Sequence, residues 1–365
     1  MENFEALSAQ FGVPLADVTM IALNAHGVCA NNGLGRARCM IAPDAAQGRV
    51  FRTIVATNRV DSRFDIDGDR LLLDGSSIGR ASKIEHDDAR LGYFRDGQRI
   101  LTLNTNARSH CTGCVFCPNT GSDASDPKVD TATDELRNWL SLMCQREGIA
   151  DLSRVEQVNL STSCFGDEQA AIEHLRFLRR ELNALGFRGR LGILSSVIRS
   201  RAGFDKVVHE VGPFALFLTL ECVTRRDLWL KESKASLGTL AALDLLRQAR
   251  SAGCSTGVTL VVGLDLIEDV CAWLSEALPE LTEFPNLQVY QVHSRFMQAA
   301  GAMGIQPIRW FLEARIALEN CLRPFRAQLR PEHWQNYRPF WYTQYLGEDL
   351  CSPGTVMFSQ QAAAP

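Results

Sequence analysis

Three cysteines, Cys111, Cys114 and Cys117, lie within seven residues of one another. They follow the apolar run 99–106 and precede the turn-rich loop 118–127. Cysteines this close cannot pair among themselves without strain, and an odd thiol would remain. Three thiolates from one loop suit a soft metal centre, and an iron–sulfur cubane ligated fully by protein takes four. A cubane held by three cysteines keeps one iron open, which predicts a reactive site.

The elements around this loop alternate between strand and helix patterns from Ile100 onward. Apolar runs occur at 100–106, 155–163, 190–197, 213–221, 256–264 and 287–293, and helical patterns at 131–147, 168–185, 204–211, 236–252 and 266–281. This alternation predicts an α/β fold with a parallel sheet. Six units are too few for a closed eight-stranded barrel, so we expect a partial (β/α)6 barrel over residues 100–300. Ligands would bind at the carboxyl ends of its strands, where the cysteine loop also falls.

Two flanking regions differ from this core. In residues 1–99, short alternating runs separated by Asp-Gly and Gly-Ser predict a small β-rich N-terminal extension with hairpins. Its Cys29 and Cys39 lack a Cys-x-x-Cys pair, which favours two unpaired thiols over a second metal site. Residues 301–365 form a C-terminal tail with an amphipathic helix over 308–322 and an aromatic run from 333 to 345. We expect the aromatic run to pack over the open side of the barrel, and the alternative is that it lines a substrate pocket.

Composition limits the classes of function. The chain has 365 residues, 46% hydrophobic and 22% charged, with a net charge of -4. This charge gives no electrostatic support for nucleic acid or an anionic membrane as a partner. No apolar run approaches the roughly 20 residues of a membrane-spanning helix, and the acidic N-terminus does not resemble a signal peptide. With twelve cysteines as mostly free thiols, we expect a cytoplasmic protein.

The cysteine triad follows the first strand of a parallel β/α array, and Phe116 directly precedes the last cysteine. This arrangement resembles the radical S-adenosylmethionine (radical SAM) superfamily. The resemblance implies a [4Fe–4S] cluster on three cysteines, with S-adenosylmethionine on the fourth iron and reductive cleavage to a 5′-deoxyadenosyl radical. The usual spacing in the superfamily is Cys-x-x-x-Cys-x-x-Cys. In this chain the interval between the first two cysteines is one residue shorter, and His110 stands where the first cysteine of that motif would be. We assign Cys111 as the third ligand because a thiolate binds iron better.

A second segment of the resemblance follows the second strand. Gly166, Asp167 and Glu168 are similar to the Gly-Gly-Glu segment of the superfamily, with Phe165 at the first glycine. The resemblance implies that this segment holds the methionyl amino group of the cofactor. A carboxylate suits an ammonium, and a glycine permits close backbone approach. The alternative is an ordinary helix start with acidic residues in its first turn.

Later strand ends supply further cofactor contacts by the same resemblance. Glu221 closes the fourth strand, where it would contact the ribose or methionyl part, and Gly263 on the fifth strand would lie against the adenine. The methionyl carboxylate is expected to meet cations that follow the fourth strand: Arg225 or Arg226, and Lys231 or Lys234. The alternative for these cations is a solvated helix start.

Two residues are candidates for direct catalysis. The thiol of Cys164, at the end of the second strand, could return a hydrogen atom to a substrate radical. The alternative is a small packing residue, which is the more common role of cysteine. His293, at the end of the sixth strand, could face cofactor or substrate, and its alternative is a hydrogen-bonded structural histidine.

The sequence shows no cobalamin-type domain, no second cysteine-rich cluster motif in the tail and no basic surface for tRNA, which favours a small-molecule or peptide substrate. The superfamily resemblance implies a reductant such as flavodoxin or ferredoxin. Three other interpretations remain open. The enzyme could transfer an aminocarboxypropyl group from S-adenosylmethionine instead. The cysteines could form a zinc site with His110, or Cys114 and Cys117 could form a thiol redox module. A spectrum of protein purified without oxygen would distinguish these interpretations. Iron–sulfur absorption would indicate one of the two S-adenosylmethionine enzymes, and its absence would favour the zinc site or the thiol redox module.

Overall fold

The computed structural model describes most of the chain, including strands and helices of each predicted β/α unit. The described residues are 2–30, 35–57, 59, 61–86, 92–95, 97–105, 113–117, 133–161, 165–292, 307–330, 339–350 and 355–356. Cys111, Cys164 and His293 lie outside these residues, so their predicted roles remain predictions.

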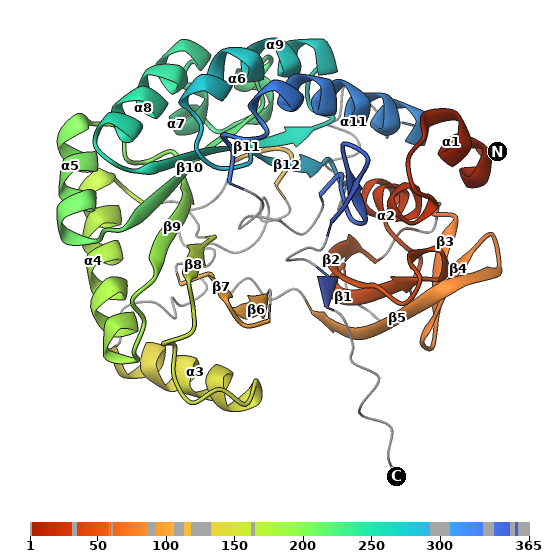
Figure 1. The fold of residues 1–365 in the computed structure, drawn as a ribbon, viewed down its shortest axis with the longest axis horizontal. Coiled ribbons are helices and arrows are strands. Elements are labelled where there is room, and N and C mark those ends of the chain that lie inside the picture. The colour runs from red at the N-terminus through yellow and green to blue at the C-terminus, as the bar shows by residue number, and fades with distance from the viewer. Residues whose placement is uncertain are drawn as a thin grey trace.

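A seven-stranded sheet forms the centre of the predicted barrel (Figure 1). In spatial order its strands are β12 (Asn286–Val289), β11 (Ser255–Val262), β10 (Phe214–Glu221), β9 (Arg190–Ser195), β8 (Gln157–Leu160), β7 (Ile100–Leu103) and β6 (Tyr93–Arg95). Strands β7 to β12 are parallel, whereas β6 pairs antiparallel with β7. The parallel strands are buried almost throughout, which explains why they read as continuous apolar runs.

Helices follow each parallel strand and form an arc outside the sheet (Figure 1). They are α3 (Thr133–Arg146), α4 (Glu168–Ala184), α5 (Arg201–Glu210), α8 (Thr239–Ser251) and α9 (Ile267–Ala277), with two short helices, α6 (Arg226–Trp229) and α7 (Glu232–Ala235), after β10. The predicted alternation of strands and helices is confirmed, and the sheet curls into a half-barrel. It has seven strands rather than six because β6 adds an antiparallel edge.

A second, antiparallel sheet is built mainly from the first hundred residues. Its order is β15 (Thr355–Val356), β2 (Val50–Ala56), β1 (Arg36–Pro43), β5 (Ser76–His86), β4 (Arg70–Leu73) and β3 (Phe64–Asp67). The expected β-rich N-terminal region is therefore present, and the chain's last described strand completes it. Two helices, α1 (Phe4–Phe11) and α2 (Leu15–His26), precede this sheet, and α2 is buried along most of its length.

The two sheets are held together partly by cation–aromatic contacts. The guanidinium of Arg38 lies 5.1 Å from the ring centroid of Tyr93, and that of Arg52 lies 5.0 Å from it. Arg38 and Arg52 belong to neighbouring strands of the antiparallel sheet, whereas Tyr93 belongs to β6. Such contacts stabilise more strongly when the cation is desolvated, and Arg38 is buried.

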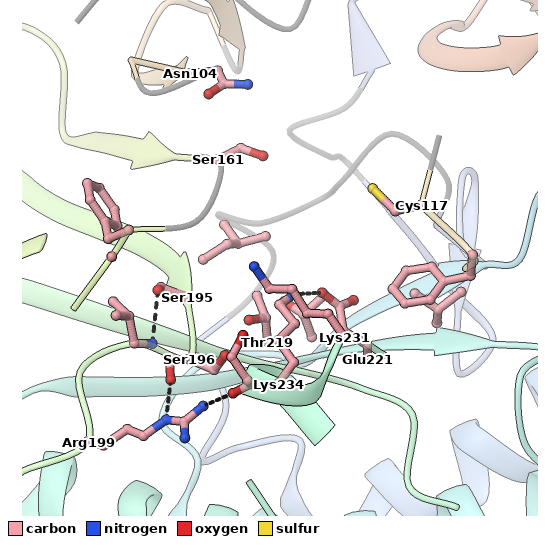
Figure 2. Close-up of a pocket in the computed structure, with 18 of the residues that line it drawn as sticks. Asn104, Cys117, Ser161, Ser195, Ser196, Arg199, Thr219, Glu221, Lys231 and Lys234 are labelled. Atoms are coloured by element: carbon pink, nitrogen blue, oxygen red, sulfur yellow. Dashed lines mark hydrogen bonds and ion pairs between the residues drawn. The ribbon is translucent and has the colours of Figure 1, made fainter. Parts of the chain in front are cut away.

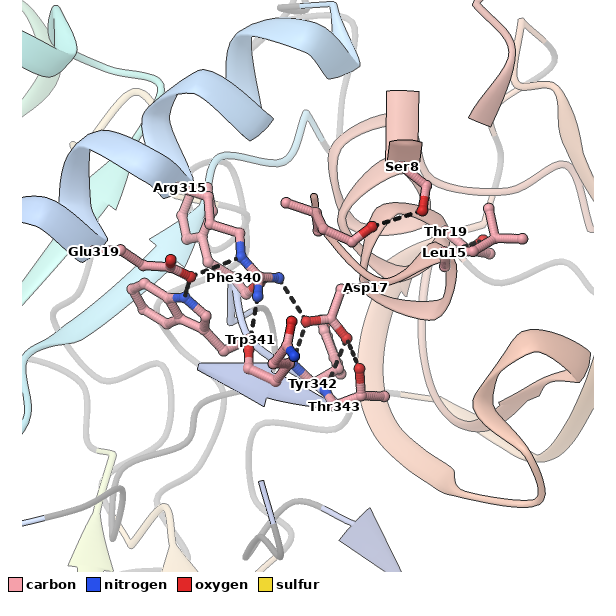
Figure 3. A network of polar contacts seen from close by, with 12 residues as sticks. Ser8, Leu15, Asp17, Thr19, Arg315, Glu319, Phe340, Trp341, Tyr342 and Thr343 are labelled. Atoms are coloured by element: carbon pink, nitrogen blue, oxygen red, sulfur yellow. Dashed lines mark hydrogen bonds and ion pairs between the residues drawn. The ribbon is translucent and has the colours of Figure 1, made fainter. Parts of the chain in front are cut away.

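A buried polar network joins α2 and residues 341–343 to α11 (Ile308–Leu322), and Figure 3 shows its residues. Asp17 of α2 accepts from the guanidinium of Arg315 at 2.5 Å, from the backbone N–H of Thr343 at 2.7 Å and from its hydroxyl at 2.6 Å. Arg315 also donates to Glu319, which accepts from the indole of Trp341. The network therefore fixes the C-terminal segment against both helices.

The described part of the aromatic tail packs in the core. Phe340, Trp341 and Tyr342 are buried. Trp341 meets the ring of Phe284 edge to face at 5.4 Å between centroids, and Tyr342 meets Phe51 of β2 at 5.2 Å. Residues 331–338 of the same run lie outside the described residues.

No single helix among the described residues is long and apolar enough to cross a membrane. Helices α1 and α2 meet that requirement only as a pair, with a bend of 117° between them.

Candidate functional site

A cavity of about 480 Å³ lies at the carboxyl ends of the parallel strands (Figure 2). Small polar residues from successive strand ends line it, including Asn104 after β7, Ser161 after β8, Ser195 of β9 and Thr219 of β10. Parallel strands present their carboxyl ends at one edge of a sheet, which is where α/β proteins bind ligands. The volume is within the range of small-molecule sites.

The described part of the cysteine loop docks at this edge. The backbone N–H of Cys117 donates to the carbonyl of Cys114 at 3.1 Å, so the two cysteines bracket a tight turn. The N–H of Val115 donates to the carbonyl of Trp229 in α6 at 2.9 Å, which fixes the turn beside the end of β10. Cys114 is buried, whereas Cys117 and Phe116 line the cavity.

A glycine permits this docking. Gly113 has a φ of 97°, a conformation that L-residues rarely adopt, and a Cβ there would lie 3.2 Å from the Cβ of Lys231. The loop therefore approaches the segment after α6 closely, and Lys231 lies directly beside Gly113.

The two described thiols suit a soft metal centre. They lie on one turn, at the rim of a cavity, and thiolates are the ligands of iron–sulfur clusters. Within the described residues no three His, Cys, Asp or Glu side chains form a possible metal site. Cys111, the third predicted ligand, is outside that set. Cys222 packs in the same apolar cluster as Cys114, and burial raises the pKa of its thiol, which keeps it protonated.

The Gly166–Glu168 segment lines the cavity, but its carboxylates bond to the backbone. Asp167 accepts from the N–H of Ala170 at 2.8 Å and caps α4. Glu168 accepts from the N–H of Ser200 at 2.9 Å and from its hydroxyl at 2.5 Å, which fixes the chain before α5. Asp167 thus caps α4, Glu168 holds the residues before α5, and both line the wall of the cavity.

Glu221 is positioned by an irregularity in the sheet. The pairing of β10 with β11 shifts register between Thr219 and Glu221, and Glu221 has a φ of 71°. Bulges of this kind redirect a side chain beside functional sites. The ammonium of Lys234 donates a hydrogen bond to the carboxylate of Glu221 at 2.8 Å, and both residues line the cavity (Figure 2).

Of the other predicted cations, only Lys231 and Lys234 line the cavity. The Lys231 ammonium makes no hydrogen bond or ion pair with any described residue. Arg225 is exposed and does not line the cavity. Its neighbour Arg226 is buried and donates to the carbonyls of Leu220 at 2.8 Å and Lys234 at 2.8 Å. Burial lowers the pKa of Arg226.

Asp265 supports the segment after Glu221. Its buried carboxylate accepts from the N–H groups of Val223 at 2.7 Å and Thr224 at 2.8 Å, and from the Thr224 hydroxyl at 2.6 Å. Burial raises the pKa of this carboxyl despite these hydrogen bonds. Asp265 follows β11, so it joins the ends of two neighbouring strands.

Gly263 does not line the cavity. It has a φ of 121°, and a Cβ there would lie 2.7 Å from the Cβ of Tyr290. The glycine is therefore required by the backbone and by the close approach of the segment after β12. Thr259 and Val261 of the same strand line the cavity instead.

Several lining residues were not predicted from the sequence. Thr219 is 7% exposed, and its hydroxyl has no hydrogen-bond partner among the described residues; the same holds for the side-chain oxygen of Asn104. Both are small polar residues at the end of an apolar strand, and that pattern could have identified them. Arg36 lines the cavity from β1 of the other sheet, and no local pattern marks it.

No family model and no curated protein matches this chain. Among solved structures, seven chains match, and one is HydG, titled a maturase of the [FeFe]-hydrogenase. The identity is 10% and the TM-score 0.41, and the match covers 63% of this chain and 49% of that one. The chain thus spans about half the length of HydG. At this level the similarity carries no argument. The chain's own fold and site define it as a β/α half-barrel protein with a cysteine-rimmed, polar cavity.

Proposed function

We propose that this protein is a radical SAM enzyme whose cavity binds S-adenosylmethionine beside a [4Fe–4S] cluster. One observation carries the proposal: the turn that holds Cys114 and Cys117 lies at the rim of the cavity formed by the strand ends. A soft-metal donor set and a ligand-sized cavity therefore coincide at the edge where such folds bind ligands.

Cys111, Cys114 and Cys117 would hold the cluster. When bound, the reduced cluster supplies the electron that cleaves S-adenosylmethionine to methionine and a 5′-deoxyadenosyl radical. A reductant such as flavodoxin or ferredoxin would provide that electron. Phe116 lines the cavity beside Cys117 and would lie next to the cluster.

The remaining residues of the cavity would bind and orient the cofactor and the substrate. The ammonium of Lys231 suits a carboxylate, either of the methionyl group or of a substrate. The carboxylate of Glu221 keeps acceptor capacity beyond its bond to Lys234 and can receive a hydroxyl or ammonium. Thr219 and Asn104 offer hydrogen-bonding groups that lack partners among the described residues. An unpaired buried polar group is costly, so a ligand that satisfies these groups would bind more tightly.

The substrate is proposed to be a small molecule or peptide that approaches from the side of the antiparallel sheet. Arg36 brings a guanidinium from that sheet into the cavity lining, which favours a substrate with an anionic group. We expect Arg36→Gln to raise KM for such a substrate, whereas Arg80→Gln, an exposed change on β5 of the same sheet, leaves it unchanged. Cys164 and His293 remain candidates for hydrogen return and substrate contact.

The proposal is tested first by metal content. Protein purified and reconstituted without oxygen should hold about four irons per chain and show broad visible absorption. Alanine variants of Cys111, Cys114 or Cys117 should each lose most of the iron. Cys254→Ala is the matched control, because Cys254 is buried and lies before β11, away from the cavity lining. A colourless, zinc-loaded protein would overturn the proposal, and full loading of Cys111→Ala with loss in His110→Ala would overturn the ligand assignment.

Product analysis tests the chemistry. The reduced protein should convert S-adenosylmethionine to 5′-deoxyadenosine and methionine. Methylthioadenosine would instead indicate cleavage of the other bond and transfer of an aminocarboxypropyl group. Neither product, with the cluster intact and reduced, would reject both forms of the enzyme. With the true substrate in heavy water, Cys164→Ala should form 5′-deoxyadenosine normally and lose deuterium incorporation if that thiol returns hydrogen.

A further inference from the structure

Arg199 joins three parts of the cavity wall, and Figure 2 shows it beside Ser196 and Lys234. Its guanidinium donates from Nε to the carbonyl of Ser196, directly after β9, at 2.7 Å. It also donates from Nη2 to the carbonyl of Ser233 in α7 at 2.7 Å. The backbone N–H of Arg199 donates to the carboxylate of Glu168, the first residue of α4, at 2.5 Å. One residue thus connects the end of β9, the start of α4 and α7.

The contact with α7 is important because this helix is short. Helix α7 has four residues, and a helix of a single turn is not stable in isolation. The carbonyls at the end of a helix need partners from outside it, and cations suit that end. Arg199 donates to the carbonyl of Ser233, and Arg226 donates to that of Lys234 at 2.8 Å. The position of α7 therefore depends on two guanidinium groups.

Helix α7 and the residue before it carry two of the cations that line the cavity. Lys231 stands at the N-terminal cap of α7, and Lys234 lies within the helix and donates to Glu221 at 2.8 Å. A displacement of α7 would therefore move both ammonium groups. The guanidinium of Arg199, in contrast, forms no ion pair with any residue that the structure describes, and it is directed to the two carbonyls.

We propose that Arg199 is a positioning residue for ligand binding, which holds α7 so that Lys231 and Lys234 keep their places in the cavity wall. The inference rests on the proposed function in one respect, that the cavity binds S-adenosylmethionine beside these lysines. An arginine suits this role because its planar fork presents two donors in a fixed geometry, which the ammonium of a lysine does not reproduce. Arg199 is exposed, so its replacement should loosen α7 without unfolding the protein.

Hydrogen exchange of the full-length chain without ligand tests the positioning. The backbone N–H groups of Ala235 and Ser236 bond within the α7 turn, so peptides that cover 232–237 report its opening. We expect Arg199→Gln and Arg199→Lys each to speed exchange there about fivefold or more, the effect of losing one hydrogen bond. Arg201→Gln is the matched control, because Arg201 is an exposed arginine that pairs with Asp205 within α5, and it should leave exchange unchanged. Unchanged exchange in Arg199→Gln would overturn the proposal.

Calorimetry with S-adenosylmethionine and the reconstituted protein separates positioning from direct attraction. Both Arg199→Gln and Arg199→Lys should bind about fivefold more weakly or worse, because both lack the fork that holds α7. Wild-type affinity in Arg199→Lys, with weak binding in Arg199→Gln, would mean that the charge alone acts, and it would overturn the positioning role. When Lys231 and Lys234 are both replaced by Met, Arg199→Gln should cause no further loss, because a positioning residue acts only through those lysines. An equal further loss would also overturn it.

The two measurements distinguish failure of this inference from failure of the proposed function. Faster exchange in Arg199→Gln together with wild-type affinity would overturn the binding role of Arg199 and leave the proposed function intact. A wild-type protein that does not bind S-adenosylmethionine would reject the proposed function and, with it, that binding role. The exchange rates would still decide whether Arg199 holds α7, because they are measured without ligand.

Discussion

The carboxylate of Glu221 and the ammonium of Lys234 lie 2.8 Å apart at the end of β10, with side chains only 12% and 16% exposed. Glu221 holds this position with a φ of 71°, which costs a residue other than glycine about 1 kcal/mol or more. Strained backbone and nearly buried charge both oppose folding unless they are compensated. Their combination at the wall of a cavity supports the proposed binding role of Glu221.

Two substitutions of Glu221 distinguish its effect on stability from its effect on ligand binding. Glu221→Gln leaves Lys234 largely buried without its carboxylate, and we expect a loss of about 2 kcal/mol or more in the free energy of unfolding. Glu221→Gly leaves the same cation but relieves the strained φ, so it should be less destabilising by about 1 kcal/mol. Urea denaturation measures both. Both variants should bind S-adenosylmethionine at least tenfold more weakly, and wild-type affinity in either would contradict the assigned role.

Asp265 should affect the same site without touching a ligand. Asp265→Ala removes the acceptor of two backbone N–H groups and one hydroxyl in a buried segment, at a cost of about 2 kcal/mol or more. Asp265→Asn keeps one acceptor oxygen and should fall between Ala and wild type in urea denaturation. Because the segment it holds follows Glu221 directly, ligand affinity should decrease in the same order. Equal stability of all three proteins would show that the segment does not depend on these bonds.

The fold was largely predictable because its signals are local. Each parallel strand is a continuous apolar run, and each outer helix has a regular period, so the order of elements followed from the sequence alone. The pairing of Tyr93–Arg95 with β7 and the pairing of Val50–Ala56 with residues 355–356 were not predicted. These pairings join segments that are distant in sequence or very short, and neither leaves a periodic pattern.

The site was predictable where a residue's type is unusual for its position. Glu221 ends an apolar strand, and the structure brings it to the cavity with Lys231 and Phe116. Arg225 and Arg226 illustrate the limit, since composition cannot tell an exposed arginine from a buried one that binds carbonyls. Arg36 could not be placed at all, because its proximity depends on how two sheets pack.

Asp61 provides a test by pH. The buried guanidinium of Arg59 donates to Asp61 at 2.9 Å and to the carbonyl of Val292 at 3.1 Å, joining the antiparallel sheet to the end of β12. The hydrogen bond from Arg59 lowers the pKa of Asp61 below its ordinary value of 3.8. A lowered pKa means that this carboxylate stabilises the folded protein above that value and stops doing so as pH falls through the folded pKa.

We therefore expect Asp61→Asn to be less stable than wild type at neutral pH by well under 1 kcal/mol, since Asp61 is about half exposed. The difference should vanish at a pH well below 3.8, where both side chains are neutral. Urea denaturation at the two pH values measures it. A difference that persists unchanged in acid would mean that Asp61 acts through packing rather than through its charge.

Asp17 and Arg315 should be the most sensitive polar pair in the described core. Asp17 is fully buried and Arg315 is 2% exposed, and removing one partner of a buried pair costs about 3 to 5 kcal/mol. Asp17→Ala also removes the acceptor of the Thr343 N–H and hydroxyl, whereas Arg315→Met leaves that acceptor in place. We expect Asp17→Ala to be the more destabilising change in urea denaturation and to make the C-terminal segment more accessible to limited proteolysis. Asp67→Ala, which breaks an exposed ion pair between β3 and β4, should cost under about 0.5 kcal/mol. If Asp17→Ala cost no more than Asp67→Ala, the network in Figure 3 would not hold the C-terminal segment in place.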